Sequence, residues 1–302
     1  MSIDFKGRVA IVTGAGGGLG RQHALALAAR GAKVVVNDLG GARDGSGGSL
    51  TAAQAVVQEI VAAGGEAIAN GASVTDWDAV QAMVQQAIDT WGRVDILVNN
   101  AGILRDKSFA KMELADFRLV MDVHLMGAVH CCKAVWPHMV AQKYGRIMMT
   151  TSSSGLYGNF GQSNYGAAKL ALVGLMQTLA IEGAKFDIRV NALAPTAATR
   201  MTEDLMSEAV LAALRPEAVV PAMLVLVSDN APSRAILCAG AGSVESANIT
   251  LTQGAWIGFG TEAPERLEEL LDQVRDRTGE SVPASGAAQG ALEIASATTE
   301  LA

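Results

Sequence analysis

The sequence has few cysteines and no long apolar run. Its three cysteines, Cys131, Cys132 and Cys238, suit neither a disulfide framework nor a spaced thiolate metal site, and they fit a reducing compartment. Uninterrupted apolar stretches stay below the ~18 to 20 residues that span a bilayer, and the N-terminus MSIDFKGRVA lacks the pattern of a signal peptide. We therefore expect a soluble cytoplasmic protein with no membrane partner and no metal.

Charged residues are also scarce, and basic residues form no cluster. The chain of 302 residues has 23 Lys and Arg against 30 Asp and Glu, a net charge of -7, which argues against nucleic acid as a partner. Only 18% of the residues are charged whereas 50% are hydrophobic, unlike the composition of a disordered protein. A sizeable buried core is expected.

Glycine-rich turns separate short β-branched runs from longer stretches rich in Ala and Leu. This alternation is typical of βαβ units around a parallel sheet, whose buried strands are continuous apolar runs such as VAIV and DILV. It predicts an α/β fold, a single doubly wound Rossmann-type domain with a mostly parallel sheet of about seven strands and helices on both faces. The expected strands are Val9 to Val12, Lys33 to Asn37, Glu66 to Ala69, Val94 to Asn99, Arg146 to Thr150, Ile188 to Ala194 and one near Ile236. Helices are expected over residues 20–30, 50–63, 77–91, 116–142, 165–184 and 217–228.

We expect residues 1–260 to form this domain, including a substrate loop at about 195–215, and residues 261–302 to form a C-terminal extension. Leucines at helical spacing predict a helix over residues 263–277 of the extension. From Gly279 onward the chain is rich in Ser, Ala, Gly and Thr and lacks aromatic residues, which indicates a flexible or partner-docked tail.

The first predicted strand leads into the octapeptide TGAGGGLG, which begins at Thr13 and is followed by a helix. In this context glycines let a pyrophosphate approach a helix N-terminus. The spacing is TGxxxGxG rather than GxGxxG, and tight packing of the turn alone is the alternative that the octapeptide leaves open. The candidate cofactor-binding residues of the turn are Gly14, Gly16, Gly18, Leu19 and Gly20.

Asp38 ends the second predicted strand, close to the distance of roughly 20 residues at which a carboxylate binds the adenosine ribose hydroxyls. Its charge would repel a ribose phosphate, which favours NAD over NADP as the cofactor. Arg43 is the one nearby basic residue that argues for NADP. An ordinary strand-end Asp that caps the following loop is the alternative.

The fourth predicted strand ends in Asn99-Asn100-Ala101-Gly102, at the carboxyl edge of the sheet where doubly wound proteins bind their ligands. Asparagine side chains at such a position often brace neighbouring strands and turns. We assign this bracing role to Asn99 and direct cofactor contact to the backbone around Ala101 and Gly102, and include Asn100 among the cofactor-binding candidates.

Tyr165 and Lys169 are four residues apart in a predicted helix, so their side chains share one face. An adjacent cation favours the phenolate and brings a tyrosine, with an ordinary pKa of about 10, toward useful acid-base catalysis. Ser152 lies just past the fifth predicted strand, where its hydroxyl can bond a substrate oxygen, with Ser153 and Ser154 as rivals.

Together, TGAGGGLG, NNAG, a serine after the fifth strand and YGAAK resemble the short-chain dehydrogenase/reductase family over nearly all of residues 5–260. The resemblance implies hydride transfer between alcohols and a nicotinamide, with Ser152, Tyr165 and Lys169 as the catalytic residues. It also implies cofactor contacts from Val74, Pro195, Thr199, Tyr165 and Lys169, and a homodimer or homotetramer. One position departs from the family, since His124 stands where most members have an asparagine that completes a water relay to the lysine. Either His124 serves that relay or it is a packed core residue.

Longer sequence segments resemble a narrower branch of the family, the (3R)-hydroxyacyl-CoA dehydrogenase domain of multifunctional enzyme type 2. These segments include NDLGG, VNNAGILRDKSFAKM, VHLMG and YGRIMMTTSSSGLYGNFGQSNYGAAK. That branch also has the histidine and the aspartate and uses NAD. The similarity weakens after Pro216, and the chain ends in TTELA rather than in a peroxisomal tripeptide such as SKL, so we expect a free-standing enzyme.

The leading expectation is therefore an NAD-dependent oxidation of a small-molecule alcohol, a (3R)-hydroxyacyl-CoA, to the 3-ketoacyl-CoA. A hydroxysteroid dehydrogenase and a 3-ketoacyl reductase are the alternatives within this class. A non-catalytic NAD(H)-sensing protein and a scaffold subunit of a hetero-oligomer are the alternatives from other classes, because fold alone does not establish catalysis.

Overall fold

The computed structural model describes residues 3–42, 44–197 and 208–300 and divides the chain into two units, Met1–Ser246 and Ala247–Ala302. The first unit holds the sheet and every candidate site residue that the structure describes. Its boundary lies before residue 260, where we placed the end of the domain from the sequence.

The first unit is built on one sheet with the strand order β3-β2-β1-β4-β5-β6-β7-β8. Strands β1 to β7 pair in parallel, in a register that sets Val9 beside Lys33 and Ala10 beside Ile96. This confirms the predicted doubly wound, mostly parallel sheet. The strands are β1 Val9–Thr13, β2 Lys33–Asn37, β3 Glu66–Asn70, β4 Ile96–Asn99, β5 Gly145–Thr150, β6 Ile188–Thr196, β7 Ile236–Gly240 and β8 Ser243–Ala247.

The eighth strand, β8, corrects the predicted count of about seven. It follows β7 after the two residues Ala241 and Gly242, which both have positive φ angles, 50° and 83°. Two such residues in succession form the tight turn of an antiparallel hairpin. The sequence SVESA has no apolar face to bury, and four of its five residues are exposed, so hydrophobic alternation does not reveal this strand.

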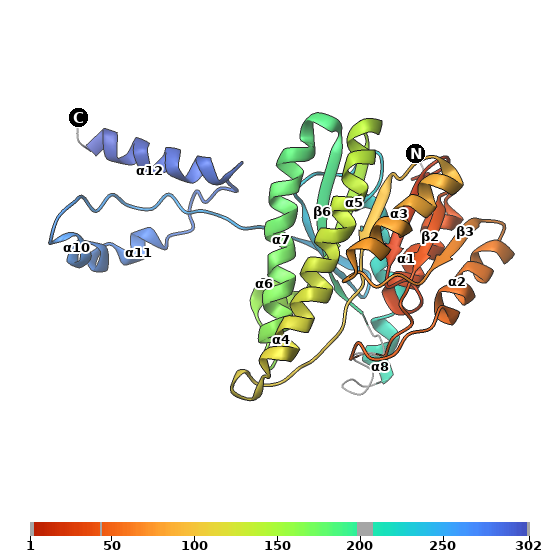
Figure 1. Cartoon of the computed structure of the whole chain (residues 1–302). Helices are drawn as coiled ribbons and strands as arrows, with labels where there is room; N and C mark the ends of the chain where they lie inside the picture. Colours follow the sequence, from red (N-terminus) through yellow and green to blue (C-terminus); the bar gives the residue numbers. More distant parts are fainter. Residues whose placement is uncertain (1–2, 43, 198–207, 301–302) are drawn as a thin grey trace. The chain divides into compact units, whose positions relative to one another are not determined.

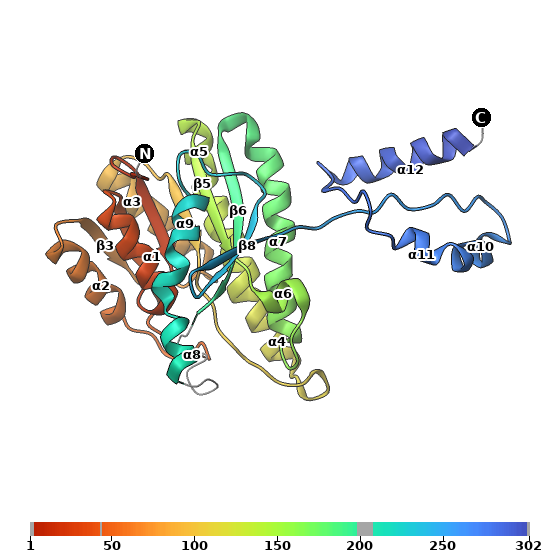
Figure 2. The same ribbon diagram turned by 180° about the vertical axis from the view of Figure 1, so that it is seen from behind.

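Helices cover both faces of the sheet (Figures 1 and 2). The face seen in Figure 1 carries α3 Trp77–Trp91, α4 Leu114–Met121, α5 Gly127–Gln142 and α7 Ser163–Gly183, and the opposite face carries α1 Gly18–Ala29, α2 Thr51–Ala62 and α9 Val220–Leu226. Two further helices are short. Helix α6 Ser153–Tyr157 follows β5, and helix α8 Glu208–Ala213 precedes α9. The strand order reverses between β1 and β4. In doubly wound proteins, ligands bind outside the carboxyl ends of the strands at this point.

Two continuous helical stretches, Leu114–Gln142 and Ser163–Phe186, have the length and composition of membrane spans. Both belong to the helix layer of the sheet, where residues such as Val135, Met139 and Met176 are buried in the core. Core helices of a water-exposed α/β protein pass the same composition test.

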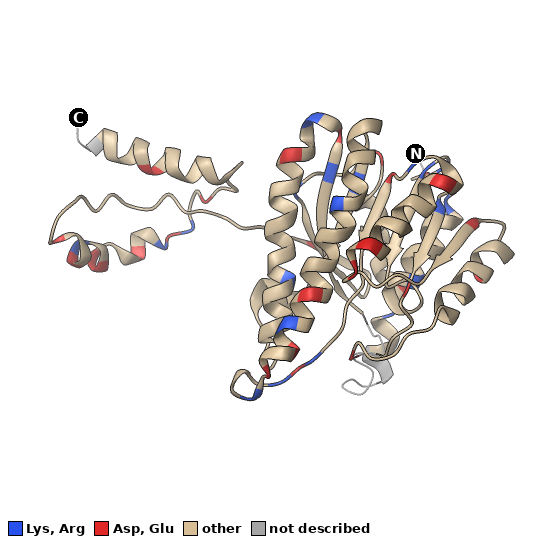
Figure 3. Ribbon diagram, viewed as in Figure 1, with Lys and Arg blue, Asp and Glu red and all other residues tan. Residues whose placement is uncertain are grey.

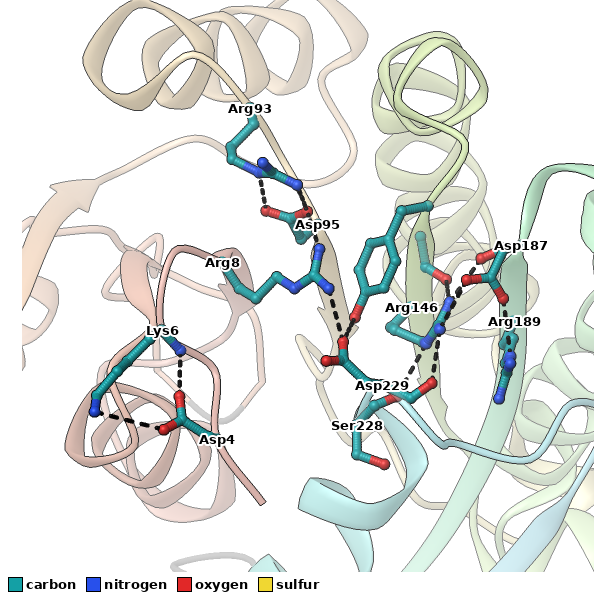
Figure 4. Close-up of polar contacts among 12 residues, drawn as sticks. Asp4, Lys6, Arg8, Arg93, Asp95, Arg146, Asp187, Arg189, Ser228 and Asp229 are labelled. Atoms are coloured by element: carbon teal, nitrogen blue, oxygen red, sulfur yellow. Dashed lines mark hydrogen bonds and ion pairs between the residues drawn. The ribbon is translucent and has the colours of Figure 1, made fainter. Parts of the chain in front are cut away.

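At the amino ends of the strands, buried ion pairs fix the sheet (Figure 4). The fully buried carboxylate of Asp95 accepts hydrogen bonds from Arg93 at 2.6 and 2.7 Å, from Arg8 at 3.4 Å and from the backbone N–H of Val9 at 2.9 Å. Because the partners come from β1 and from the start of β4, this carboxylate holds two central strands in register.

Arg146 on β5 forms a second anchor at the same edge. Its buried guanidinium donates to the backbone carbonyls of Ser228, Gly145, Asp187 and Asp229 and to the Asp187 carboxylate. The chemistry-bearing residues lie at the opposite, carboxyl edge. The ribbon in Figure 3 shows Lys and Arg positions interspersed with Asp and Glu positions along the strands and helices of the described chain.

The second unit contains three helices, α10 Ala263–Glu269, α11 Leu271–Val274 and α12 Gly286–Glu300, and an antiparallel bridge between Leu251 and Ser281. The first two occupy the helix predicted over 263–277. The stretch from Gly279, predicted as a flexible or partner-docked tail, contains α12, whose described side chains are mostly exposed.

Candidate active site

The glycine-rich turn connects β1 to α1 and packs against the end of β4. Gly14 has a positive φ of 64°, and a side chain at Gly20 would lie 2.2 Å from the Gly14 carbonyl oxygen. Gly17 precedes α1 without a side-chain cap. The first N–H groups of a helix have no partner within it, so this uncapped turn is a suitable cradle for a pyrophosphate.

Asp38 lies directly beside this turn. Its carboxylate accepts hydrogen bonds from the backbone N–H groups of Gly16 at 2.7 Å and Gly40 at 2.6 Å. A side chain at Gly16 would approach the Asp38 carboxylate to 2.8 Å, which explains the glycine there. The predicted rival residue Arg43 lies outside the described residues.

The end of β4 is tied to the glycine-rich turn by Asn100 and Thr13. The Asn100 amide donates to the backbone carbonyls of Thr13 at 2.9 Å and Gly14 at 3.1 Å. The Thr13 hydroxyl oxygen in turn accepts from the backbone N–H groups of Asn100 and Ala101, both at 3.0 Å. The bracing role that we assigned to Asn99 therefore belongs to Asn100. Thr13 was missed, although its place in the TGxxxGxG motif was a usable signal.

Asn99 is buried without a strong partner. Its amide nitrogen lies 3.5 and 3.4 Å from the sulfurs of Cys132 and Met149, and its Oδ1 has no partner within the described chain. Such an atom requires a water or a ligand nearby.

Ser152, Tyr165 and Lys169 converge at the carboxyl end of β5. Ser152 caps the N-terminus of α6, where its Oγ accepts from the backbone N–H of Ser154 at 3.2 Å. Its own proton can therefore be donated, to the Tyr165 phenol in this structure or to a substrate oxygen. Tyr165 and Lys169 lie one turn apart on α7, with Nζ 5.4 Å from the centre of the tyrosine ring. The Lys169 ammonium donates to the Thr150 carbonyl at 2.5 Å. Of the rivals, Ser153 is exposed and the Ser154 hydroxyl donates to Gln162.

Burial shifts the pKa values of Lys169 and Tyr165. It lowers the pKa of Lys169 to about 7. It also raises the pKa of Tyr165, in the same sense as the charge of Asp106, although the hydrogen bond with Ser152 acts in the opposite sense. We expected the ammonium to favour the phenolate. Instead, burial raises the pKa of the phenol above its ordinary value, so Tyr165 is protonated at neutral pH.

His124 lies in a π-helical turn, Asp122–Met126, between α4 and α5. Its Nε2 is 2.8 Å from the carbonyl oxygen and 3.1 Å from the backbone nitrogen of Ile103, and its ring meets the Tyr165 ring edge to face at 5.2 Å. Burial, together with the charge of Lys169, lowers the pKa of His124 to about 3, so the imidazole is neutral. A side chain at Gly102 would collide with this ring at 2.2 Å.

A cavity of about 10 Å³ lies between these residues, the size that one water requires. Two of its lining residues, Asn99 and His124, each have a buried polar atom without a partner in the described chain, Oδ1 and Nδ1 respectively. Its lining residues are Thr13, Val74, Asn99, Ala101, Val123, His124, Gly127, Ala128, Lys169 and Leu172. The structure thus brings together Val74, Ala101, His124 and Lys169, which the sequence only placed on separate elements.

The substrate side is described in part. Pro195 lies near the end of β6, whereas Thr199 falls outside the described residues, as do all residues of the predicted loop from 198 to 207. Two basic residues after β4 are paired, since Arg105 and Lys107 both donate to the Asp116 carboxylate at 2.7 and 3.2 Å.

Comparison with known proteins shows the family of this chain. The family model for the short chain dehydrogenase matches residues 8–209. The chain is 48% identical over 286 residues to the peroxisomal multifunctional enzyme A of Dictyostelium discoideum, covering 94% of this chain and 64% of that protein. It is 51% identical to a putative short-chain type dehydrogenase/reductase of Mycobacterium tuberculosis, covering 82% of this chain and 87% of that one. The similarity therefore extends beyond the residues 5–260 that we expected.

Solved structures give the same result. Full-length peroxisomal multifunctional enzyme type 2 from Drosophila melanogaster superposes with a TM-score of 0.81 and 35% identity, over 99% of this chain and 51% of that chain. A 7α-hydroxysteroid dehydrogenase in complex with NADH and 7-oxo glycochenodeoxycholic acid superposes with a TM-score of 0.71 and 31% sequence identity. The match covers 80% of this chain and 95% of that chain. The chain thus spans between 25% and 64% of the length of the multifunctional enzymes that it matches. It belongs to the short-chain dehydrogenase family, and it is an oxidoreductase that acts on CH–OH groups with a nicotinamide cofactor.

Proposed function

We propose that this chain oxidises (3R)-hydroxyacyl-CoA thioesters to 3-ketoacyl-CoA with NAD. The observation that carries the chemistry is the convergence of Ser152, Tyr165 and Lys169 beside the glycine-rich turn. The substrate is inferred from the similarity to multifunctional enzymes, one of which is named a hydratase-dehydrogenase-epimerase and is 54% identical over 76% of this chain.

The residues of the first unit fit NAD. The uncapped turn before α1 suits the pyrophosphate, and the Asp38 carboxylate suits the ribose hydroxyls and repels a 2′-phosphate. When bound, NAD accepts the hydride that leaves the alcohol carbon.

In this proposal Tyr165 takes the hydroxyl proton of the substrate as the hydride leaves, and the Ser152 hydroxyl donates a hydrogen bond to the same oxygen. Because the phenol is protonated in the described state, it must first release its own proton to the solvent. The Lys169 ammonium, whose pKa lies near neutrality, stabilises the phenolate that results. Both tautomers of His124 find a partner in Ile103, at its carbonyl or its N–H, so Nδ1 can either donate to or accept from a water in the small cavity. We propose that this water carries the proton between Lys169 and His124.

The test is NADH formation by the purified chain with (3R)- and (3S)-hydroxyacyl-CoA of several chain lengths, and with estradiol. Preference for the 3R thioester supports the proposal. Turnover of the steroid alone would replace the substrate assignment and retain the dehydrogenase. A reductase of 3-oxoacyl carrier protein is 46% identical over 74% of this chain, so reduction of 3-ketoacyl thioesters with NADPH is measured alongside. Faster reduction with NADPH than oxidation with NAD would contradict the proposal.

A further inference from the structure

Asn164 is fully buried, lies one position before Tyr165, and uses both polar ends of its side chain. Its Oδ1 accepts from the backbone N–H of Tyr165 at 2.7 Å, and its Nδ2 donates to the backbone carbonyl of Arg105 at 3.0 Å. The N–H groups in the first turn of a helix have no partner within the helix, and Gln162 gives α7 no side-chain cap. Asn164 therefore provides the partner for the N–H of Tyr165 itself.

The carbonyl that Asn164 binds belongs to a segment held from two sides. The Arg105 guanidinium donates to the Asp116 carboxylate on α4 at 2.7 Å and to the backbone carbonyl of Asp44, in the glycine-rich loop after β2, at 3.0 Å. Arg105 and Lys107 lower the pKa of Asp116, so this pairing persists well below neutral pH. Arg105 is thus a fixed reference point for the start of α7.

A fixed backbone at Tyr165 matters because the phenol has several close neighbours. Its ring meets His124 edge to face at 5.2 Å, and Lys169 lies 5.4 Å from the ring centre. A rotation of the first turn of α7 would displace the phenolic oxygen from Ser152. A misplacement of about 1 Å costs on the order of 100-fold in rate.

We propose that Asn164 is a positioning residue that holds the backbone of Tyr165 against Arg105 and so sets the phenol for proton transfer. This inference rests on the proposed role of Tyr165. Two other contacts join the same segments, from the Lys107 N–H to the Gly161 carbonyl at 2.9 Å and from Gln162 to Asp106 at 2.8 Å. They keep the segments together when Asn164 is replaced, so variants at this position are expected to fold.

The test compares N164A, which removes both hydrogen bonds, with N164D, which keeps the acceptor and replaces the donor by a carboxylate. For both we expect kcat for the alcohol to fall roughly 10- to 100-fold, with the Kd for NAD within about twofold of the unchanged enzyme. The kcat of N164D relative to the unchanged enzyme should rise as the pH falls, because a protonated carboxyl group can again donate to the Arg105 carbonyl. The matched control is S163A, since the Ser163 hydroxyl has no hydrogen-bond partner in the described chain.

Unchanged kcat in both Asn164 variants would overturn the proposal. If both variants lose NAD binding as well as turnover, the proposal is also overturned, because Asn164 would then be needed for folding rather than for positioning Tyr165. Y165F is measured in parallel. If Y165F keeps normal turnover, the proposed function itself fails, whereas an inactive Y165F beside normal Asn164 variants rejects this inference alone.

Discussion

At the scale of single residues, burial decides which side chains carry charge. His124 and His23 are buried with pKa values of about 3 and 4, and Lys169 has one of about 7. His23 follows the glycine-rich turn on α1, and neither of its ring nitrogens has a partner in the described chain. A neutral imidazole in such a place is tolerated, whereas an imidazolium is not.

Acid should therefore destabilise the protein in a defined window. The unfolded state takes up a proton on each histidine near pH 6.5, but the folded state does so only near pH 4 for His23 and pH 3 for His124. The free energy of unfolding thus falls as the pH drops below about 6.5, by up to about 1.4 kcal/mol per pH unit for each histidine. Urea unfolding of H23L at pH 6.5, 5.5 and 4.5 should show roughly half of this slope. An unchanged slope would show that His23 is protonated without cost.

The substitution G20A adds one methyl group to the glycine-rich turn and tests whether this turn binds NAD. A side chain there would lie 2.2 Å from the Gly14 carbonyl oxygen and 2.5 Å from the Asn100 amide, so G20A must shift the turn. We expect the Kd for NAD to rise at least roughly tenfold, equivalent to about 1.4 kcal/mol. Gly174, on an exposed face of α7 with open space around it, gives the control G174A, which should bind NAD normally and be stabilised by up to about 1 kcal/mol. Equal NAD affinity in both variants would contradict the role of the turn.

At the scale of elements, the buried strands and long helices could be predicted because their apolar patterns are continuous. Strands β1 and β2 end within one residue of their predicted limits. The π-helical turn at His124 and the strand β8 could not be predicted, since neither has a hydrophobic period of its own. The motif spacing identified Tyr165, Lys169 and Ser152, but the contacts of Asn99, Asn100 and Asn164 depend on elements distant in sequence.

The end of β2 is expected to decide cofactor choice. Asp38 holds its carboxylate beside the turn through Gly16 and Gly40, so D38S removes the group that repels a 2′-phosphate while leaving a small polar side chain. The ratio of kcat/KM for NAD to that for NADP should fall at least roughly tenfold. Steady-state kinetics with both cofactors measure it. The exposed Asp44 in the following loop provides the control D44S, which should keep the preference for NAD. An unchanged ratio in D38S would remove Asp38 from the cofactor site.

The amino ends of β1 and β4 should contribute stability without affecting chemistry. D95N leaves Arg8 and Arg93 facing a neutral amide in a fully buried position. Because the Arg8 and Arg93 side chains are 23% and 39% exposed, water still solvates their charges, and loss of the charge-assisted hydrogen bonds is expected to cost about 1 to 3 kcal/mol of unfolding free energy. Chemical denaturation measures the loss, and KM for NAD should remain unchanged at temperatures where the variant is folded. A large change in KM would mean that the two edges of the sheet are coupled.

At the scale of the whole molecule, the sheet separates stability from catalysis. Ion pairs occupy its amino edge, while the glycine-rich turn, Asp38 and the group around Tyr165 occupy its carboxyl edge. This division is expected of doubly wound proteins, whose ligands bind where the strand order reverses. The central claim is that Tyr165 carries the proton transfer at this edge. We also propose that the chain acts as a homodimer or homotetramer, as the family resemblance implies.

The most direct test of this role of Tyr165 is to measure both kcat and the Kd for NAD of the Y165F variant. The substitution removes one oxygen and leaves the ring packed against His124. We predict that kcat with the best (3R)-hydroxyacyl-CoA falls by roughly 100- to 10,000-fold, the usual contribution of a general acid or base, while the Kd for NAD changes less than about threefold. Turnover within about threefold of the unchanged enzyme would contradict the account.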